Sequence, residues 1–183
     1  MTLSHIRSSS DIRHTARAST LTRRHSLMLL GLGASALALH PTGVMGQTGH
    51  LVTAHNRAPD GAQMAFAPAV LRIEVGDTVR FEHADRGHNV QSYDDMLPDG
   101  AAGFVGDLGE ELEVSFNAEG TYGYFCRPHR MMGMIGYVLV GDFTRNLDAV
   151  RAASDALPGP MSANRVAEYM AQIDAIGRDE GLI

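Results

Sequence analysis

Short segments in which apolar and polar residues alternate follow one another between residues 51 and 140, separated by glycine, proline or aspartate. Val70–Val75 alternates in part, Gly76-Asp77 supplies a turn, and Thr78–Glu82 follows as a second segment. Further segments of this kind lie at 112–116, 122–126 and 135–140. Because strands alternate with a period of two and turns favour these residues, this part of the chain is predicted to be a β-sandwich or barrel.

The pattern changes after Asp142, where apolar residues recur at helical spacing. A first helix is predicted at Asn146–Ala156, and Leu157–Pro160 ends it. A second helix is predicted at Ser162–Ile176, with apolar positions at Val166, Tyr169, Met170 and Ile173. A segment of about 40 residues makes too small a core for a separate domain, so both helices are expected to cover one sheet of the sandwich.

Residues 1–46 have the character of an export signal. Residues 1–25 contain five arginines and one acidic residue, and an apolar stretch follows from Leu27 to Leu39. This stretch is shorter than the roughly 20 residues that span a bilayer, which favours a cleavable signal over an uncleaved anchor. The pair Arg23-Arg24 fits the twin-arginine export route, and general secretion fits the segment equally well.

Cleavage after Gly46 would leave residues 47–183 as one periplasmic domain, with strands over about 50–142 and helices over about 143–178. Five of the 15 basic and one of the 21 acidic residues precede residue 47, so this domain has a formal net charge of −10. An acidic domain repels the phosphate backbone, so nucleic acid is not an expected partner. We expect a monomer without a membrane span.

Cys126 is the only cysteine of the chain, and it precedes His129 and Met134 in the loop between two predicted strands. Exported proteins usually pair their cysteines, so a single one indicates a metal ligand, a nucleophile or a buried structural thiol. His88 follows a turn elsewhere in the predicted sheet. A thiolate, two imidazoles and a thioether are the ligands of a blue-copper electron-transfer site. The sequence therefore predicts one copper ion, bound by His88, Cys126, His129 and Met134.

Asn89 is the predicted outer contact of this site, because it can connect the His88 segment to the Cys126 loop. The other histidines in this half of the chain have no comparable neighbours in the sequence. His50, His55 and His83 are therefore expected to be solvated surface residues.

The motifs around the predicted ligands resemble the pseudoazurin family of type 1 copper proteins. They are Gly87–Val90, Met96–Ala101, Tyr122–Cys126, Pro128-His129 and Met132–Met134. The spacing Cys-x₂-His-x₄-Met differs from plastocyanin and azurin, which have a longer Cys-to-His gap, and from amicyanin, which has a shorter His-to-Met gap. Val75–Val79, Gly141-Asp142 and the two predicted helices also match, so the resemblance covers residues 47–183. It implies a mainly β fold, the cupredoxin Greek-key β-sandwich with two C-terminal helices.

The resemblance implies an electron carrier rather than an enzyme, with copper bound by the same four residues. It also implies donation of electrons through the exposed edge of His129 to a denitrification reductase such as copper nitrite reductase. Nitrous oxide reductase and a c-type cytochrome are the other expected partners. Met64 matches a family methionine that packs near a ligand histidine.

The sequence departs from this family around the ligand loop. Arg127, Arg130 and Met131 replace the smaller or aromatic residues expected there, and the lysines that usually surround the docking face are absent. We expect Met131 and Met132 to form an apolar contact, surrounded by a positive rim that includes Arg86. Such a rim would orient an acidic partner and make association dependent on salt.

Two other function classes stand beside the electron carrier. A periplasmic copper chaperone or storage protein would use the same ligands without redox traffic. A cysteine hydrolase would use Cys126 as nucleophile with His129 or His88 as base, but the sequence offers no orienting acid or oxyanion-hole motif and gives Met134 no purpose. A spectrum of the copper-loaded protein distinguishes these classes.

Overall fold

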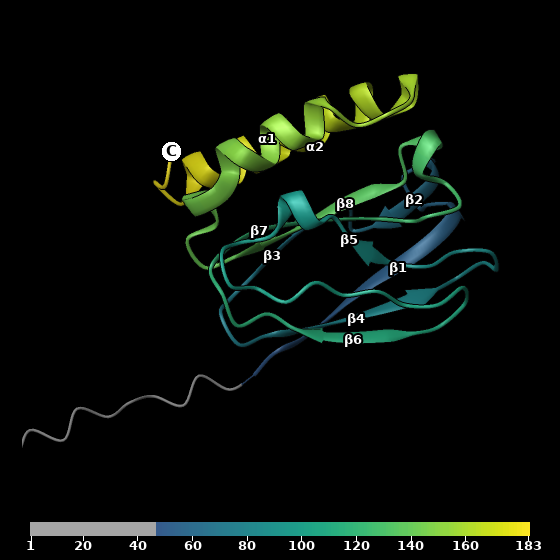
Figure 1. Cartoon of the computed structure of the whole chain (residues 1–183), viewed down its shortest axis with the longest axis horizontal. Helices are drawn as coiled ribbons and strands as arrows, with labels where there is room; N and C mark the ends of the chain where they lie inside the picture. Colours follow the sequence, from purple (N-terminus) through teal and green to yellow (C-terminus); the bar gives the residue numbers. More distant parts are fainter. Residues whose placement is uncertain (1–46) are drawn as a thin grey trace, which may run out of the picture. The chain divides into compact units, whose positions relative to one another are not determined.

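The computed structural model describes residues 47–183, and the predicted export signal lies outside the described residues. Two four-stranded sheets face each other (Figure 1). The first has the order β2 (Gln63–Ala67), β1 (Gly49–Arg57), β4 (Thr78–His83) and β6 (Leu112–Ser115). The second has the order β3 (Val70–Ile73), β8 (Ile135–Val140), β7 (Gly120–Phe125) and β5 (Gln91–Ser92). The predicted β-sandwich is therefore confirmed.

The strand pairing mixes both directions. β1 lies parallel to β4, and β3 lies parallel to β8, while the remaining pairs are antiparallel. The turn at Gly76-Asp77 does not form a hairpin, because β3 and β4 belong to different sheets. The chain instead passes from one sheet to the other at this turn, where the Gly76 amide donates to the carbonyl of Phe116 at 2.7 Å.

The core has two layers of apolar side chains. The inner layer lies between the sheets and includes Val52, Phe66, Phe81, Phe116 and Tyr124. The outer layer joins β7 and β8 to the helices, through residues such as Phe125, Tyr137, Leu139, Val150 and Ile173. All six residues of β8 are buried, because this strand has apolar neighbours on both faces. That burial explains why Ile135–Val140 is an almost continuous apolar run rather than an alternating one.

The helices cover the second sheet, as the sequence predicts (Figure 1). α1 spans Leu147–Asp155 and α2 spans Pro160–Asp179. α2 begins before the predicted Ser162, because a proline suits the first turn of a helix. Three 3₁₀ turns accompany them, η1 (Asp94–Met96), η2 (Arg130–Met132) and η3 (Phe143–Asn146). No helix within residues 47–183 is long and apolar enough to cross a membrane.

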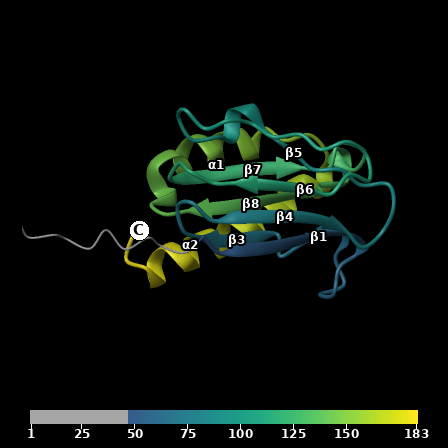
Figure 2. The same cartoon turned by 90° about the horizontal axis from the view of Figure 1, so that it is seen from below.

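The start of β1 and the C-terminal end of the chain lie at the same end of the sandwich (Figure 2). β7 runs away from that end, and the green turn that contains η2 lies at the opposite end (Figure 1). The ligand loop therefore lies at the end of the sandwich that is remote from the start of β1 and from the C-terminal end of the chain.

Candidate metal centre

Cys126 directly follows β7, and Met134 directly precedes β8. The loop between them closes on itself through main-chain hydrogen bonds. The Cys126 amide donates to the Met134 carbonyl at 2.9 Å, the His129 amide donates to Cys126 at 3.1 Å, and the Met134 amide donates to His129 at 3.2 Å. Two neighbouring strands and these bonds fix the positions of three predicted ligands.

The structure brings His88 to the same point from the loop that follows β4. The Nδ1 atom of His88 lies 3.7 Å from the Cys126 Sγ atom and 3.2 Å from the Nδ1 atom of His129. The His129 Nδ1 atom lies 3.4 Å from the same sulfur. Zinc sites give typical metal–nitrogen and metal–sulfur bond lengths for these ligands. Three such bonds in one plane around a single ion would separate the two nitrogens by about 3.5 Å and each nitrogen from the sulfur by about 3.8 Å. The three donors therefore have the spacing that one metal ion requires.

Burial differs among the four predicted ligands. His88, Cys126 and Met134 are completely buried, while His129 is half-buried. Met134 belongs to the same core cluster as Cys126, and Met64 packs against that cluster. His129 is thus the member of the group that reaches the surface.

Burial also sets the protonation of the metal-free site. It lowers the pKa of His88 to about 4, with the nearby His129 acting in the same direction, and it lowers the pKa of His129. Burial raises the pKa of the Cys126 thiol, although main-chain amides of Asn89 and His129 favour the thiolate. At neutral pH both imidazoles are consequently neutral and able to bind a metal, whereas the thiol must release a proton on binding.

Two asparagines support the cluster from outside. The Asn56 Oδ1 atom, at the end of β1, lies 3.2 Å from the Nε2 atom of His88. This oxygen can only accept, so Nε2 carries the proton and Nδ1 is left free for the metal. Asn89 accepts from the amide of Arg127 at 2.8 Å and donates to the carbonyl of Gly106 at 3.1 Å. The predicted contact of Asn89 is confirmed, whereas Asn56 was not predicted.

The surface around His129 combines positive charge with apolar area. Arg86, Arg127 and Arg130 are exposed, and Met131 is 60% exposed. The Arg130 guanidinium lies 5.3 Å from the ring centres of both Tyr93 and Phe125. A cation over aromatic faces is held in place without losing its charge. The three arginines of the predicted positive rim are thus exposed, and Arg130 has a fixed position.

The expectation of solvated histidines elsewhere is wrong for two of them. His50, His55 and His83 are all half-buried. The Nε2 atom of His50 lies 2.9 Å from a carboxylate oxygen of Asp77, and that of His83 lies 2.7 Å from the carbonyl of Glu110. These contacts lie outside the metal-ligand group, which consists of His88, Cys126 and His129 within the described residues.

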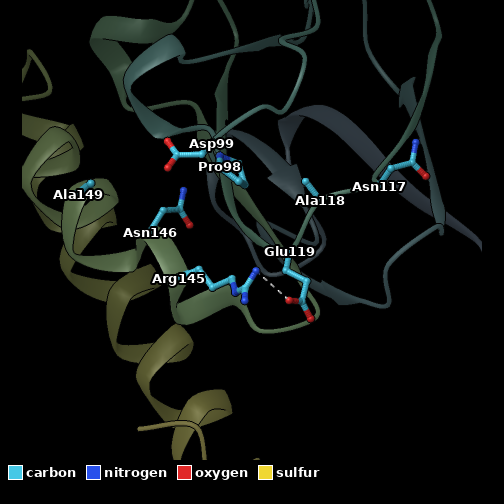
Figure 3. A pocket seen from close by; sticks show the side chains of 8 residues that line it. All are labelled: Pro98, Asp99, Asn117, Ala118, Glu119, Arg145, Asn146 and Ala149. Atoms are coloured by element: carbon cyan, nitrogen blue, oxygen red, sulfur yellow. Dashed lines mark ion pairs between the residues drawn. The ribbon is translucent and has the colours of Figure 1, made fainter.

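A pocket of about 790 Å³, lined by the residues of Figure 3, opens beside the start of β7, whereas Cys126 follows the end of that strand. Three of its polar side chains have partners. Arg145 forms an ion pair with Glu119 at 3.3 Å, and the Asn146 amide binds the main chain of Thr121. A six-residue strand is about 20 Å long, so this pocket is separate from the metal centre.

Comparisons with known proteins agree with this arrangement. Residues 52–141 match the family model of copper binding proteins, plastocyanin/azurin family. The chain is similar to a pseudoazurin of Methylorubrum extorquens, with 45% identity over 50% of this chain and 62% of that protein. It is also similar to a pseudoazurin of Paracoccus pantotrophus, with 38% identity over 68% of this chain and 84% of that protein.

Solved structures give the same result. The crystal structure of pseudoazurin from Methylobacterium extorquens AM1 matches with a TM-score of 0.63 and 38% identity, over 68% of this chain and 98% of that one. A two-sheet sandwich with a His-Cys-His group at one end is the arrangement of a cupredoxin, and its pseudoazurin and plastocyanin relatives are electron-transfer proteins rather than enzymes. Within that class, the chain belongs to the pseudoazurin family.

Proposed function

We propose that His88, Cys126, His129 and Met134 bind one copper ion and that the protein carries electrons in the periplasm. The observation that supports this most directly is the convergence of two imidazole nitrogens and one thiol sulfur at a buried point that only His129 connects to the surface. A bound copper ion supplies one-electron chemistry by alternating between Cu(I) and Cu(II).

The protein holds the ligands in fixed positions and keeps water away from the site. Cys126 and Met134 are joined by a main-chain hydrogen bond, and His88 is fixed through Asn56. A site that cannot rearrange needs little reorganisation when its charge changes, which favours rapid electron transfer. The complete burial of His88 and Cys126 excludes water and other thiols. Half-buried His129 supplies the route to a partner.

The partner we propose is a denitrification reductase, with copper nitrite reductase as the first candidate. Exposed Arg127 and Arg130 flank His129 in the ligand loop, and exposed Arg86 precedes His88, on a domain with a formal net charge of −10. A partner with an acidic docking face would be oriented by this contrast. Export through residues 1–46 would place the protein in the periplasm with such reductases.

A copper chaperone or store is the alternative function of the same ligands. Metal transfer between proteins requires a site that an incoming ligand can reach. Two of the three clustered donors have no exposed surface, so the geometry favours retention of the metal over its transfer.

The test is a visible spectrum of the copper-loaded protein, with Cys126→Ser in parallel. We expect intense thiolate-to-copper absorption that a mild reductant bleaches and that the variant lacks. Reduced protein should then pass electrons to copper nitrite reductase. A folded protein without this absorption would overturn the proposal, and a bleachable band without transfer to any denitrification reductase would overturn the choice of partner.

A further inference from the structure

The start of α2 lies directly against the ligand loop (Figure 1). A Cβ atom at Gly159 would lie 2.5 Å from the carbonyl oxygen of Met131, and one at Gly133 would lie 3.1 Å from the main chain of Met161. Both glycines have a positive φ, 95° and 70°. Main chain meets main chain here without intervening side chains, so a displacement of α2 is transmitted to the loop.

Arg165, in the second turn of α2, makes the polar part of this contact. Its Nη1 atom donates to the Gly133 carbonyl at 2.9 Å and to the Met64 carbonyl at 2.6 Å, and its Nη2 atom donates to the carbonyl of Gln63. A planar guanidinium can bind several carbonyls at once in a fixed geometry, which a lysine ammonium cannot. One side chain thus joins a helix, the ligand loop and β2.

The carbonyl of Gly133 belongs to the peptide bond that enters Met134. The Ile135 amide donates to the same oxygen at 2.9 Å, so this peptide is fixed from two directions. Met64 has a φ of 45°, a left-handed conformation that a side chain makes unfavourable. Such a conformation persists where neighbours hold it, and Arg165 is one such neighbour.

We infer that Arg165 is a positioning residue for the metal centre. It holds the Gly133–Met134 peptide and would thereby set how closely the Met134 thioether could approach a bound copper ion. A weak, long axial bond is the one most sensitive to such a displacement, and the axial ligand tunes the potential of a blue-copper site. This inference rests on the proposed ligation by Met134.

Two variants and one control test it, in protein purified from cells that express the full chain. Arg165→Met removes the charge and the hydrogen bonds, and Arg165→Lys retains the charge alone. Arg178→Met is the matched control, because Arg178 is exposed on the same helix about 20 Å further along. The first readout is amide hydrogen exchange of the copper-free protein.

We expect the amides of Cys126, Met134 and Ile135 to exchange at least about tenfold faster in Arg165→Met than in the wild type, because the loop can then open without the helix. Amides in the middle of β8 should exchange as before, and Arg178→Met should match the wild type. Equal exchange in the loops of Arg165→Met and Arg178→Met would overturn the inference. Where Arg165→Met does not fold, the same comparison with Arg165→Lys decides.

The second readout is the copper-loaded protein. The ratio of the two thiolate-to-copper absorption bands should change in both Arg165 variants and stay constant in Arg178→Met. We expect the equilibrium constant for reduction to change by about threefold to tenfold, or about 30–60 mV for one electron. If Arg165→Lys left the band ratio and the potential unchanged, the charge alone would be sufficient, and the positioning role of the hydrogen bonds would be overturned. Wild-type protein without a thiolate band would refute the proposed ligation itself, and the metal-free exchange would still report on Arg165.

Discussion

The side-chain oxygen of Asn89 accepts a hydrogen bond from the main-chain amide of Arg127 at 2.8 Å. Each residue is the immediate neighbour of a predicted copper ligand, His88 in one case and Cys126 in the other. This bond joins two loops that are 38 residues apart, so the spacing of the ligand atoms depends on it.

Replacing Asn89 with alanine should destabilise the protein and weaken its site. Asn89 is completely buried, and its loss leaves the Arg127 amide and the Gly106 carbonyl without their partner. We expect the free energy of unfolding, measured in urea, to fall by about 1–3 kcal/mol. The exposed Asn117 provides a control, and equal effects of Asn89→Ala and Asn117→Ala would contradict the prediction.

Replacing Asn56 should act on copper affinity more than on folding. Its side chain fixes the tautomer of His88 from the end of β1, and outer contacts of this kind change metal affinity by about 10- to 100-fold. Asn56→Leu should therefore bind Cu(II) more weakly in competition with a chelator. Because Asn56 is exposed, its unfolding midpoint without copper should stay near that of the wild type. Unchanged affinity would show that His88 is held by its burial alone.

The arginine rim can be tested without a biological partner. Oxidation of the reduced protein by anionic ferricyanide should slow in Arg127→Ala and Arg130→Ala, by about threefold to tenfold at low ionic strength. Oxidation by cationic tris(phenanthroline)cobalt should become faster in the same variants. The exposed Arg178, on α2, gives the control variant Arg178→Ala. Rates that move in the same direction with both oxidants would rule out a local electrostatic effect.

Removing the hydroxyl group from each of two tyrosines in β7 should change the free energy of unfolding in opposite directions. The hydroxyl of Tyr124 is buried without a hydrogen-bond partner among the described residues, whereas that of Tyr122 donates to the Ala118 carbonyl at 2.9 Å. Tyr124→Phe should raise the free energy of unfolding by about 1 kcal/mol, since an unpaired buried hydroxyl is unfavourable. Tyr122→Phe should lower it by about 1 kcal/mol. Thermal unfolding of both variants checks the signs, and destabilisation by Tyr124→Phe would contradict the first.

Asp77 lies at the opposite end of the molecule from the metal centre, and it should make the free energy of unfolding depend on pH. Burial alone would raise its pKa, but hydrogen bonds from His50 and from the amides of Thr48 and Glu74 hold the pKa below its ordinary 3.8. The unfolded chain therefore binds a proton more readily than the folded one. This contribution to stability is present above pH 3.8 and is lost as the pH falls below it.

Asp77→Asn should remove that contribution. Between about pH 4 and pH 2, the free energy of unfolding should fall less steeply with pH than in the wild type. The exposed Asp99 provides the control Asp99→Asn, which should keep the wild-type slope. Parallel curves for all three proteins would show that Asp77 does not contribute to acid unfolding.

The sequence predicts those parts of the fold that local patterns determine. β7, β8 and both helices show a clear period or a continuous apolar run between turn residues, and the structure places them there. β1 and β2 were not delimited, because apolar and polar residues do not alternate regularly along them. Nor did the turn at Gly76-Asp77 indicate that its flanking strands lie in different sheets. That arrangement depends on pairing between distant strands.

The candidate site also has a part that local sequence patterns predict and a part that depends on contacts between distant segments. Cys126, His129 and Met134 lie in one short loop, so their spacing is visible in the sequence. Asn56 and Arg165 are each 32 residues away from the group that they bind, His88 in one case and Gly133 in the other. The first contact needs the parallel pairing of β1 with β4, and the second needs α2 to lie on the loop. Neither depends on a local pattern.

The start of β1 and the C-terminal end of the chain lie at the same end of the sandwich, and the ligand loop lies at the other end (Figures 1 and 2). A tether joined to Ile183 would therefore leave the face around His129 unobstructed. Fused behind a flexible arm, the same domain could dock on a reductase while remaining attached to it, and its arrival would then depend on the length of the arm rather than on diffusion through the compartment.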